Sequence, residues 1–240
     1  MGDRPSFLVA FDTSAAHCAA AVVLDGAIAA TRFEEMGRGQ AERLMPLLDE
    51  MLRAEGLAWA EIAGIGVGIG PGNFTGTRIS VATARGLALA LGIPAVGISA
   101  FEIMREGTED AGALPPQVVS VEAPRGLAYV QTFRDGRADG APQVIDPDAV
   151  SQMPGLTAGA VVVGFRAAEI ARALGVDHRA GGAEGVPARL AHAAHRAFAR
   201  GIDPATRPAP LYVRPADAAP ARDAPPVILP SGIGPWAIPK

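Results

Sequence analysis

The stretch 64–91 constrains what this chain can fold into more than any other part of the sequence. Three aliphatic side chains, Ile65, Val67 and Ile69, alternate with four glycines. This period of two predicts a β-strand that carries side chains on one face only. Glycine weakens a strand, so a bare face indicates that another element packs very close to it. Residues 79–91 are rich in small side chains and predict a helix, and we expect this helix to pack on the glycine face.

The turn between this strand and this helix, residues 70–76, allows two interpretations. Its Gly-Pro-Gly start cannot continue a central strand, and Thr75 or Thr77 is expected to cap the helix. Backbone N–H groups at a helix N-terminus attract phosphate, so the turn could hold a phosphate group. The alternative is a tight turn that only has to pack, because glycine serves both needs. Neither standard phosphate fingerprint is met, since Gly76 is followed by Thr77 and Arg78 rather than by Lys and Ser or Thr.

Composition and charge narrow the class of protein. With 240 residues and 49% hydrophobic content, the chain can bury a large core as one domain or two. Its formal net charge of −4 does not favour a nucleic-acid-binding surface of its own. The single cysteine, Cys18, is typical of a reducing cytoplasm. No segment reads as a signal peptide or reaches the roughly 20 apolar residues that span a bilayer, so we expect a cytoplasmic protein with no membrane partner.

Polar residues close the first predicted strand. Asp12 ends that strand and is followed directly by Thr13 and Ser14. Such a strand end can hold a phosphate or a metal ion. The alternative is an Asx turn, which Asp and Ser favour in any case. The sequence predicts the strands of this region at Phe7–Asp12, 18–24 and 27–33, with an Asp-Gly hairpin turn at 25–26.

An amphipathic helix is predicted over residues 40–55. Its apolar positions recur at i, i+3, i+4, i+7 and i+8 and form one stripe, made of Leu44, Leu47, Leu48, Met51 and Leu52. In the simpler interpretation this stripe only covers the sheet. Because Met45 lies beside it, the stripe could also be wide enough to leave a face for a partner helix. The sequence leaves both interpretations open.

The second half of the chain repeats the first in weaker form. A strand at 118–122 again ends in an acid, and a second Asp-Gly hairpin turn follows at 135–136. Another strand, 161–163, leads through a glycine into a helix at 166–174. Two segments with the same order of features predict a duplicated α/β unit. We expect one lobe over residues 1–105, a second over 106–215, and a mobile tail rich in Pro and Ala over 216–240.

Residues 70–78 read Gly-Pro-Gly-Asn-Phe-Thr-Gly-Thr-Arg. This run resembles a signature of the TsaB-type (YeaZ-like) subunit of the bacterial machinery that makes threonylcarbamoyladenosine in tRNA. Shorter motifs similar to those of the family stand at 12–14, 44–46, 86–88, 97–99 and 210–214. The resemblance covers about residues 7–215 and leaves the tail outside it.

The resemblance implies both a fold and a function. The family is built on duplicated α/β lobes of the actin/sugar-kinase/Hsp70 (ASKHA) type, with mixed sheets flanked by helices. Its members are understood as non-catalytic partners of the related TsaD subunit, which transfers a threonylcarbamoyl group to N6 of adenosine 37 in tRNA. A TsaE-type ATPase joins the complex. The resemblance thus implies a heterodimer with a TsaD-type paralogue, contact with tRNA only through the complex, and no catalytic residues in this chain. Older labels for the wider family name a peptidase, but the sequence shows no Cys/His, Ser/His/Asp or metal constellation at matching positions.

The same resemblance implies which helices meet the partner. Helices 40–55 and 77–91 would pack against the paralogue as a helical bundle. A charged residue in place of Leu48 or Met51 would then abolish the complex and leave the monomer folded. An exposed apolar helix face would also allow the isolated chain to form a homodimer. The implied interface residues are Leu44, Met45, Leu48, Met51, Leu52 and Arg78.

Departures from the family pattern bear on the ligands. Gln40 stands where many TsaB-type chains have a His, and Leu127 where they have a Glu. TsaD-type subunits are expected to hold a metal through a His-x-x-x-His motif, which this chain lacks. The pair His192 and His195 has no third ligand nearby in the sequence, so we expect no metal site. We expect no cofactor bound by this chain alone, and a nucleotide site that is vestigial or that binds ATP or ADP at the partner interface, with Asp12, Thr13, Ser14 and Gly72 as its residues.

A second class of function stays open at this point. In a small-molecule phosphotransferase or ATPase of the same fold, Asp12 and the loop 70–76 would hold ATP and its metal. The acid at the strand end and the N–H-rich turn favour this alternative. Calorimetry with Mg-ATP on the isolated chain separates the two hypotheses.

Overall fold

Two five-stranded mixed sheets form the framework of the protein. The computed structural model describes residues 7–105, 115–153, 156–157, 159–180, 185–202 and 206–213. In the first sheet, three strands form an antiparallel meander and two further strands run parallel to β1. The strand order is β3 (Ala27–Glu35), β2 (His17–Leu24), β1 (Phe7–Asp12), β4 (Ile62–Gly68) and β5 (Ala95–Ile98).

The second sheet repeats this topology strand for strand. Its meander is again antiparallel, and its last two strands again run parallel to the first strand of the meander. Its strands, in the corresponding order, are β8 (Arg137–Ile145), β7 (Ala128–Arg134), β6 (Gln117–Glu122), β9 (Val161–Gly164) and β10 (Asp177–Ala180). The matching order confirms the predicted α/β fold with duplicated lobes.

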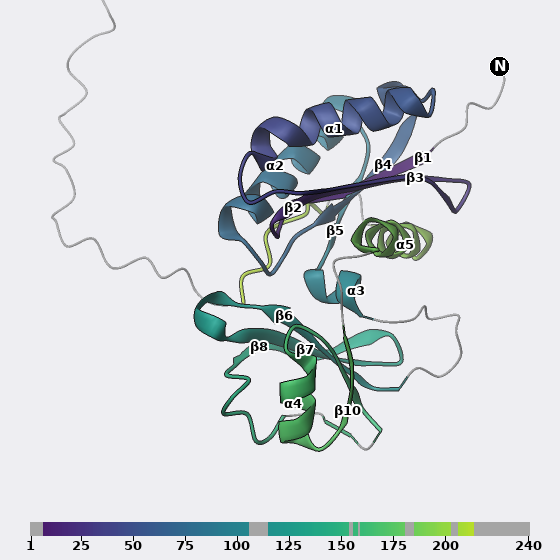
Figure 1. Cartoon of the computed structure of the whole chain (residues 1–240). Coiled ribbons are helices and arrows are strands. Elements are labelled where there is room, and N and C mark those ends of the chain that lie inside the picture. Colours follow the sequence, from purple (N-terminus) through teal and green to yellow (C-terminus); the bar gives the residue numbers. More distant parts are fainter. Residues whose placement is uncertain are drawn as a thin grey trace, which may run out of the picture.

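Helices cover both faces of the first sheet (Figure 1). One face carries α1 (Gln40–Ala54) and α2 (Phe74–Leu91), and the other carries α5 (Val186–Ala199). The short α3 (Ala100–Met104) contacts both α5 and β6, so it lies between the lobes. On the second sheet, α4 (Ala167–Leu174) packs against β9 and β10. Single 3-10 turns occur at Trp59–Glu61 and Pro124–Gly126.

The packing of α5 differs from the expected division of the chain. This helix lies within residues 106–215, which we assigned to the second lobe, yet it packs across β1, β2 and β4 of the first sheet. The chain therefore returns to the first lobe after completing the second sheet (Figure 1). The predicted tail 216–240 lies outside the described residues.

The apolar stripe of α1 is buried in the core between this helix and the first sheet. Leu44, Leu48, Met51 and Leu52 are at most 1% exposed and pack with the side chains of β1, β2 and β4. They leave no surface for a partner, which corrects the interface expected for these four residues. The simpler interpretation of the stripe is confirmed, because it covers the sheet. Met45 alone, at 39% exposure, is accessible beside it.

The bare glycine face of β4 packs against α5, not against α2 as we expected. A Cβ atom on Gly64 would lie 2.2 Å from the Phe198 ring, and one on Gly66 would lie 2.4 Å from Cβ of Ala194. Distances this short are sterically forbidden, so the glycines are needed for α5 to approach. The opposite face of β4, with Ile65 and Val67, belongs to the core that α1 and α2 cover.

Both predicted hairpin turns are confirmed. Asp25 and Gly26 have φ angles of 51° and 79°, and Asp135 and Gly136 have φ angles of 49° and 73°. Two successive residues with positive φ make a type I′ turn, which suits the twist of the strands it joins.

Within β2, burial raises the pKa of the Cys18 thiol to about 11 and keeps it neutral. None of the helices described is both long and apolar enough to cross a membrane.

Candidate functional site

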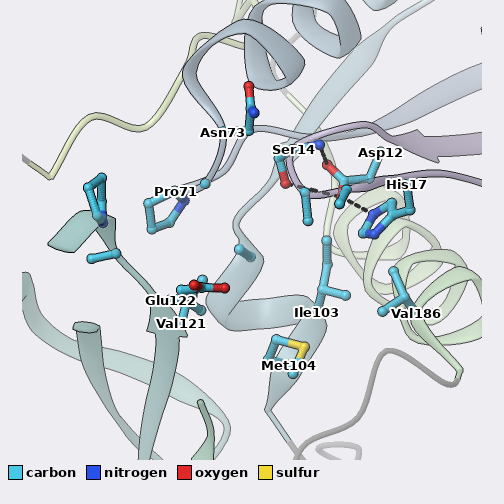
Figure 2. Close-up of a pocket in the computed structure, with 16 residues that line it drawn as sticks. Asp12, Ser14, His17, Pro71, Asn73, Ile103, Met104, Val121, Glu122 and Val186 are labelled. Carbon is cyan, nitrogen blue, oxygen red and sulfur yellow. Dashed lines mark hydrogen bonds and ion pairs between the residues drawn. The ribbon is translucent and has the colours of Figure 1, made fainter. Parts of the chain in front are cut away.

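A cleft of about 330 Å³ lies where the two lobes face each other. One side is formed by the end of β1, the turn that follows it and the loop before α2, and the other by the end of β6 (Figure 2). Most of its wall is apolar. The apolar side chains that line it are Ala15, Ala16, Pro71, Ala100, Ile103, Met104, Val121, Ala123, Pro124 and Val186.

Asp12, at the end of β1, is the acid that sequence analysis placed in this site. It is 2% exposed, and its carboxylate accepts three hydrogen bonds from its own chain (Figure 2). Oδ1 accepts from the Ser14 N–H at 3.1 Å, and Oδ2 accepts from the Ser14 hydroxyl at 3.1 Å. The Nε2 atom of His17 lies 2.9 Å from Oδ2. A Cβ on Gly68 would lie 1.9 Å from Oδ1, so this carboxylate also depends on the bare face of β4 for its space.

The loop before α2 is closed on itself by hydrogen bonds. Asn73 caps the helix: its Oδ1 accepts the Gly76 N–H at 2.9 Å, and its side chain points toward the start of α2 (Figure 2). The predicted caps, Thr75 and Thr77, are therefore wrong, because both lie inside the helix. The Asn73 N–H donates to the Ser14 carbonyl at 2.6 Å. Two N–H groups at this helix start thus already have acceptors within the chain.

Thr13 connects β1 to the first turn of α2. Its hydroxyl donates to the Gly76 carbonyl at 2.7 Å and lies 2.9 Å from the Ser80 hydroxyl. Its N–H donates to the same Ser80 oxygen at 3.3 Å. All three residues are buried, so these polar groups satisfy one another where water is excluded. Thr13 therefore contributes to packing and is not open to a ligand.

The glycines of the 70–78 motif allow two backbone segments to touch. A Cβ on Gly72 would lie 2.2 Å from the Ser14 carbonyl oxygen, and one on Gly76 would lie 1.9 Å from the Thr13 carbonyl oxygen. The structure thus brings together all four predicted nucleotide-site residues, Asp12, Thr13, Ser14 and Gly72. It joins them, however, in a network of internal contacts, which agrees with the packing interpretation of the turn.

The cleft is lined by no Lys or Arg that could bind the phosphates of a nucleotide. Glu122, at the end of β6, is the second acid of its lining. Within the described part of the chain no cation pairs with Glu122. A triphosphate would face two carboxylates, and Asp12 has its oxygens occupied by internal donors. A nucleotide held by this chain alone would therefore bind without a Lys or Arg on its phosphates.

The isolated chain is accordingly expected to give no binding heat with millimolar Mg-ATP in titration calorimetry. No Lys or Arg lines the cleft to hold the phosphates, and the N–H groups of Asn73 and Gly76 at the start of α2 are already paired. The Glu122→Gln variant, which removes one charge, is also expected to give no binding heat. A saturable heat with a dissociation constant below about 1 mM (about −4 kcal/mol) in either protein contradicts this account of the cleft.

His17 is a site residue that sequence analysis missed. It follows the Asp12 turn at the start of β2, and its ring packs 5.1 Å from the Phe33 ring. Its contact with Asp12 depends on how the turn between them folds. The sequence could have indicated this contact only through the spacing of an acid and a His five residues later. Ser14 and His17 contact the same carboxylate oxygen, and the Ser14 hydroxyl donates to Asp12 instead of to the imidazole. A nucleophilic relay requires the serine to donate to the histidine, so this trio lacks the arrangement of a hydrolase.

Metal-binding groups do not cluster in the part of the chain that the structure describes, where no three His, Cys, Asp or Glu side chains come together. The His192 and His195 pair lies on α5. The His195 ring packs against the β2–β3 turn, where a Cβ on Gly26 would lie 3.3 Å from its Cε1 atom. The position of His195 is thus explained by packing.

A second surface lies on the outside of α2. Phe74 and Tyr212 are 49% and 50% exposed, and Arg78 between them is exposed as well. Of the six residues expected at the partner interface, only Met45 and Arg78 are therefore accessible. Tyr212 belongs to residues 206–213, and this segment is anchored to the first sheet because the Leu211 N–H donates to the Ile69 carbonyl at 2.8 Å.

Comparison with known proteins shows what this chain is similar to in sequence and in fold. Residues 34–142 match the family model described as TsaD, tRNA N6-adenosine threonylcarbamoyltransferase. A Pseudomonas aeruginosa protein described as similar to the peptidase YeaZ superposes with a TM-score of 0.72 at 28% identity, over 87% of this chain and 100% of its own. YeaZ from the same organism gives a TM-score of 0.69 at 28% identity, over 86% and 99%.

More distant proteins share the fold alone. Component A of (R)-2-hydroxyglutaryl-CoA dehydratase from Acidaminococcus fermentans superposes with a TM-score of 0.50 at 10% identity, over 81% of this chain and 98% of its own. Among the curated proteins, none matches the sequence significantly. The match to the TsaD family model and the superposition on YeaZ along nearly the whole described chain agree with each other. The chain is a TsaB/YeaZ-like protein.

Proposed function

We propose that this chain is a non-catalytic subunit that binds and stabilises a TsaD-type paralogue, which transfers a threonylcarbamoyl group to N6 of adenosine 37 in tRNA. The likeness to YeaZ, which extends over 86% of this chain, is the observation that carries the proposal. The match to the TsaD family model spans α1 and α2, so the paralogue would carry equivalent helices.

The internal hydrogen bonds of Asp12 and of the loop before α2 support a role without catalysis. In this chain the Asp12 carboxylate and two N–H groups at the start of α2 take part in internal hydrogen bonds. The cleft between the lobes offers two acids and no cationic side chain to a substrate. The same features argue against the alternative of a small-molecule phosphotransferase or ATPase. The contact of Ser14 with Asp12 instead of His17 argues against the peptidase activity that the description of the Pseudomonas relative mentions.

The partners follow from this role. The paralogue would supply the catalytic site, a TsaE-type ATPase would join the pair, and tRNA would reach this chain only through the complex. A net charge of −4 is consistent with a subunit that does not bind RNA by itself. ATP or ADP at the interface between the subunits, homodimerisation of the free chain and a cytoplasmic location remain predictions of the same proposal.

Co-expression tests the proposal. A tagged copy of this chain is produced together with the TsaD-type paralogue of the same organism, and the eluate is analysed by size-exclusion chromatography with light scattering. The proposal predicts a complex of both chains in equal amounts. If both chains are folded by circular dichroism yet elute separately at micromolar concentration, the proposed function is wrong.

A further inference from the structure

The cleft between the lobes has the size and the wall of a small-molecule site. Its volume of about 330 Å³ falls within the range of about 300–1,000 Å³ that is usual for ligand pockets. Its wall comes from both lobes, because α3 supplies Ile103 and Met104 and the end of β6 supplies Val121 (Figure 2). Ala15 and Ala16, in the turn after β1, are exposed along it. Such a wall favours a ligand with an apolar body, since the burial of apolar surface drives its binding.

Glu122 is the charged group of this wall that is free to bind a ligand. Asp12 is 2% exposed, and its carboxylate already accepts hydrogen bonds from Ser14 and His17. Glu122 is exposed at the end of β6, and no cation in the described part of the chain pairs with it. Figure 2 shows Asp12 and Glu122 on opposite sides of the cleft. The cleft therefore holds one unpaired carboxylate beside an apolar wall, and not a cluster of acids.

The charge and the wall together select the class of ligand. Among the described residues that line the cleft there is no Lys or Arg, so an anionic group would have no charged partner. A calcium ion takes about six to eight oxygen ligands, which a single free carboxylate in an apolar wall does not provide. An ammonium or guanidinium group donates charge-assisted hydrogen bonds to a carboxylate, and an apolar body attached to it can pack on the wall. The reduced access of water near this wall strengthens the ion pair relative to one on an open surface.

We propose that the cleft between the lobes binds a small organic cation with an apolar body, which donates hydrogen bonds to the Glu122 carboxylate. The body of the ligand contacts Ile103, Met104 and Val121. The class comprises amines and guanidines that carry an aliphatic or aromatic group. The inference goes beyond the proposed function, which gives this cleft no substrate, and either can be wrong without the other.

Three compounds of similar shape and different charge test the inference. Tryptamine is a cation at neutral pH, tryptophol has a neutral hydroxyl in place of the ammonium group, and indoleacetate is an anion. Each is titrated into the full chain by calorimetry at neutral pH and low salt. We expect tryptamine to bind saturably with a dissociation constant below about 1 mM, at least about 10-fold tighter than tryptophol, because a hydrogen bond between charged groups is lost in the alcohol. Indoleacetate is expected to give no saturable heat.

Variants of Glu122 show whether this carboxylate sets the preference. Glu122→Gln keeps the size of the side chain, and we expect it to weaken tryptamine binding at least about 10-fold while the affinity for tryptophol stays the same. Glu122→Lys is expected to reverse the order, so that indoleacetate binds more tightly than tryptamine. The control is Glu55→Gln, the same change at an exposed carboxylate at the end of α1, outside the cleft, and it is expected to bind tryptamine as wild type does. Circular dichroism checks that each variant is folded.

Several results would overturn the inference. Equal affinities of wild type for tryptamine and tryptophol would show that the cation contributes nothing. A preference for tryptamine that persists in folded Glu122→Gln would show that the cation binds elsewhere. No saturable heat with tryptamine in wild type contradicts the site directly, and this comparison of compounds in wild type holds even where a variant fails to fold. None of these results bears on complex formation with the paralogue, which co-expression measures separately.

Discussion

The Leu48→Asp variant is expected to unfold as a monomer, not merely to lose a partner. Leu48 is fully buried beneath α1, in the core that joins this helix to β1, β2 and β4. Removing a buried Leu side chain costs about 2–5 kcal/mol, and the unpaired carboxylate adds a further penalty. A loss of at least about 5 kcal/mol is comparable with the whole stability of an ordinary domain. Thermal unfolding followed by circular dichroism measures it.

Met45→Asp is the matched control on the same helix. Met45 is 39% exposed, so a charge there stays in contact with water, and its free energy of unfolding is expected to change by less than about 1 kcal/mol. If the apolar side of α1 is buried as described, the two variants must differ in stability in this way, although their positions are only three residues apart. A Leu48→Asp protein that melts as wild type does and fails only in co-purification would show that the stripe is a partner surface after all.

The Gly66→Val variant is expected to be destabilised by at least about 3 kcal/mol, which lowers the melting temperature by about 10 °C in a chain of this size. Strand propensity alone predicts the opposite, because valine favours strands by up to about 1 kcal/mol. Packing decides the outcome: even a Cβ on Gly66 would lie 2.4 Å from Cβ of Ala194, and α5 would have to move away from the sheet.

Gly86→Ala separates packing from backbone effects in the same experiment. Gly86 lies in α2 and is exposed, and a Cβ added there would meet no neighbouring atom within 4 Å. Alanine is expected to stabilise this helix by about 0.5–1 kcal/mol. If Gly66→Val melts at or above the wild-type temperature, the close approach of α5 to β4 is contradicted.

Local patterns in the sequence predict much of the first lobe. The strand Phe7–Asp12 is continuous in apolar residues, and the Asp-Gly turns occur where two successive positive φ angles are needed. The i, i+3, i+4 spacing of α1 identifies the side that is buried. The duplicated topology is also predictable, because each half opens with a strand that ends in an acid, Asp12 or Glu122, followed by a hairpin.

Which elements pack against each other is harder to predict from the sequence. A bare strand face signals a close neighbour but not which one, and two Ala-containing helices, α2 and α5, suit it equally well. The edge strands β8 and β10 are mostly exposed or short, so their residues lack the alternation that identifies a strand. The spacing of apolar residues identifies the apolar side of α1. It does not indicate whether the sheet buries that side completely or leaves part of it exposed for a partner. The Asp12 network likewise depends on a fold that brings His17 back to the strand end.

The most direct test of the proposed role is reconstituted modification of tRNA. Threonylcarbamoyladenosine formation is measured with the TsaD-type paralogue, the TsaE-type ATPase and the threonylcarbamoyl adenylate donor, while this chain is titrated into the mixture. The account predicts no product from this chain alone and a rate that rises until one copy is present for each paralogue. It also predicts that Arg78→Glu shifts this titration to higher concentration. Full activity of the paralogue without this chain, or product formed by this chain by itself, would contradict the account.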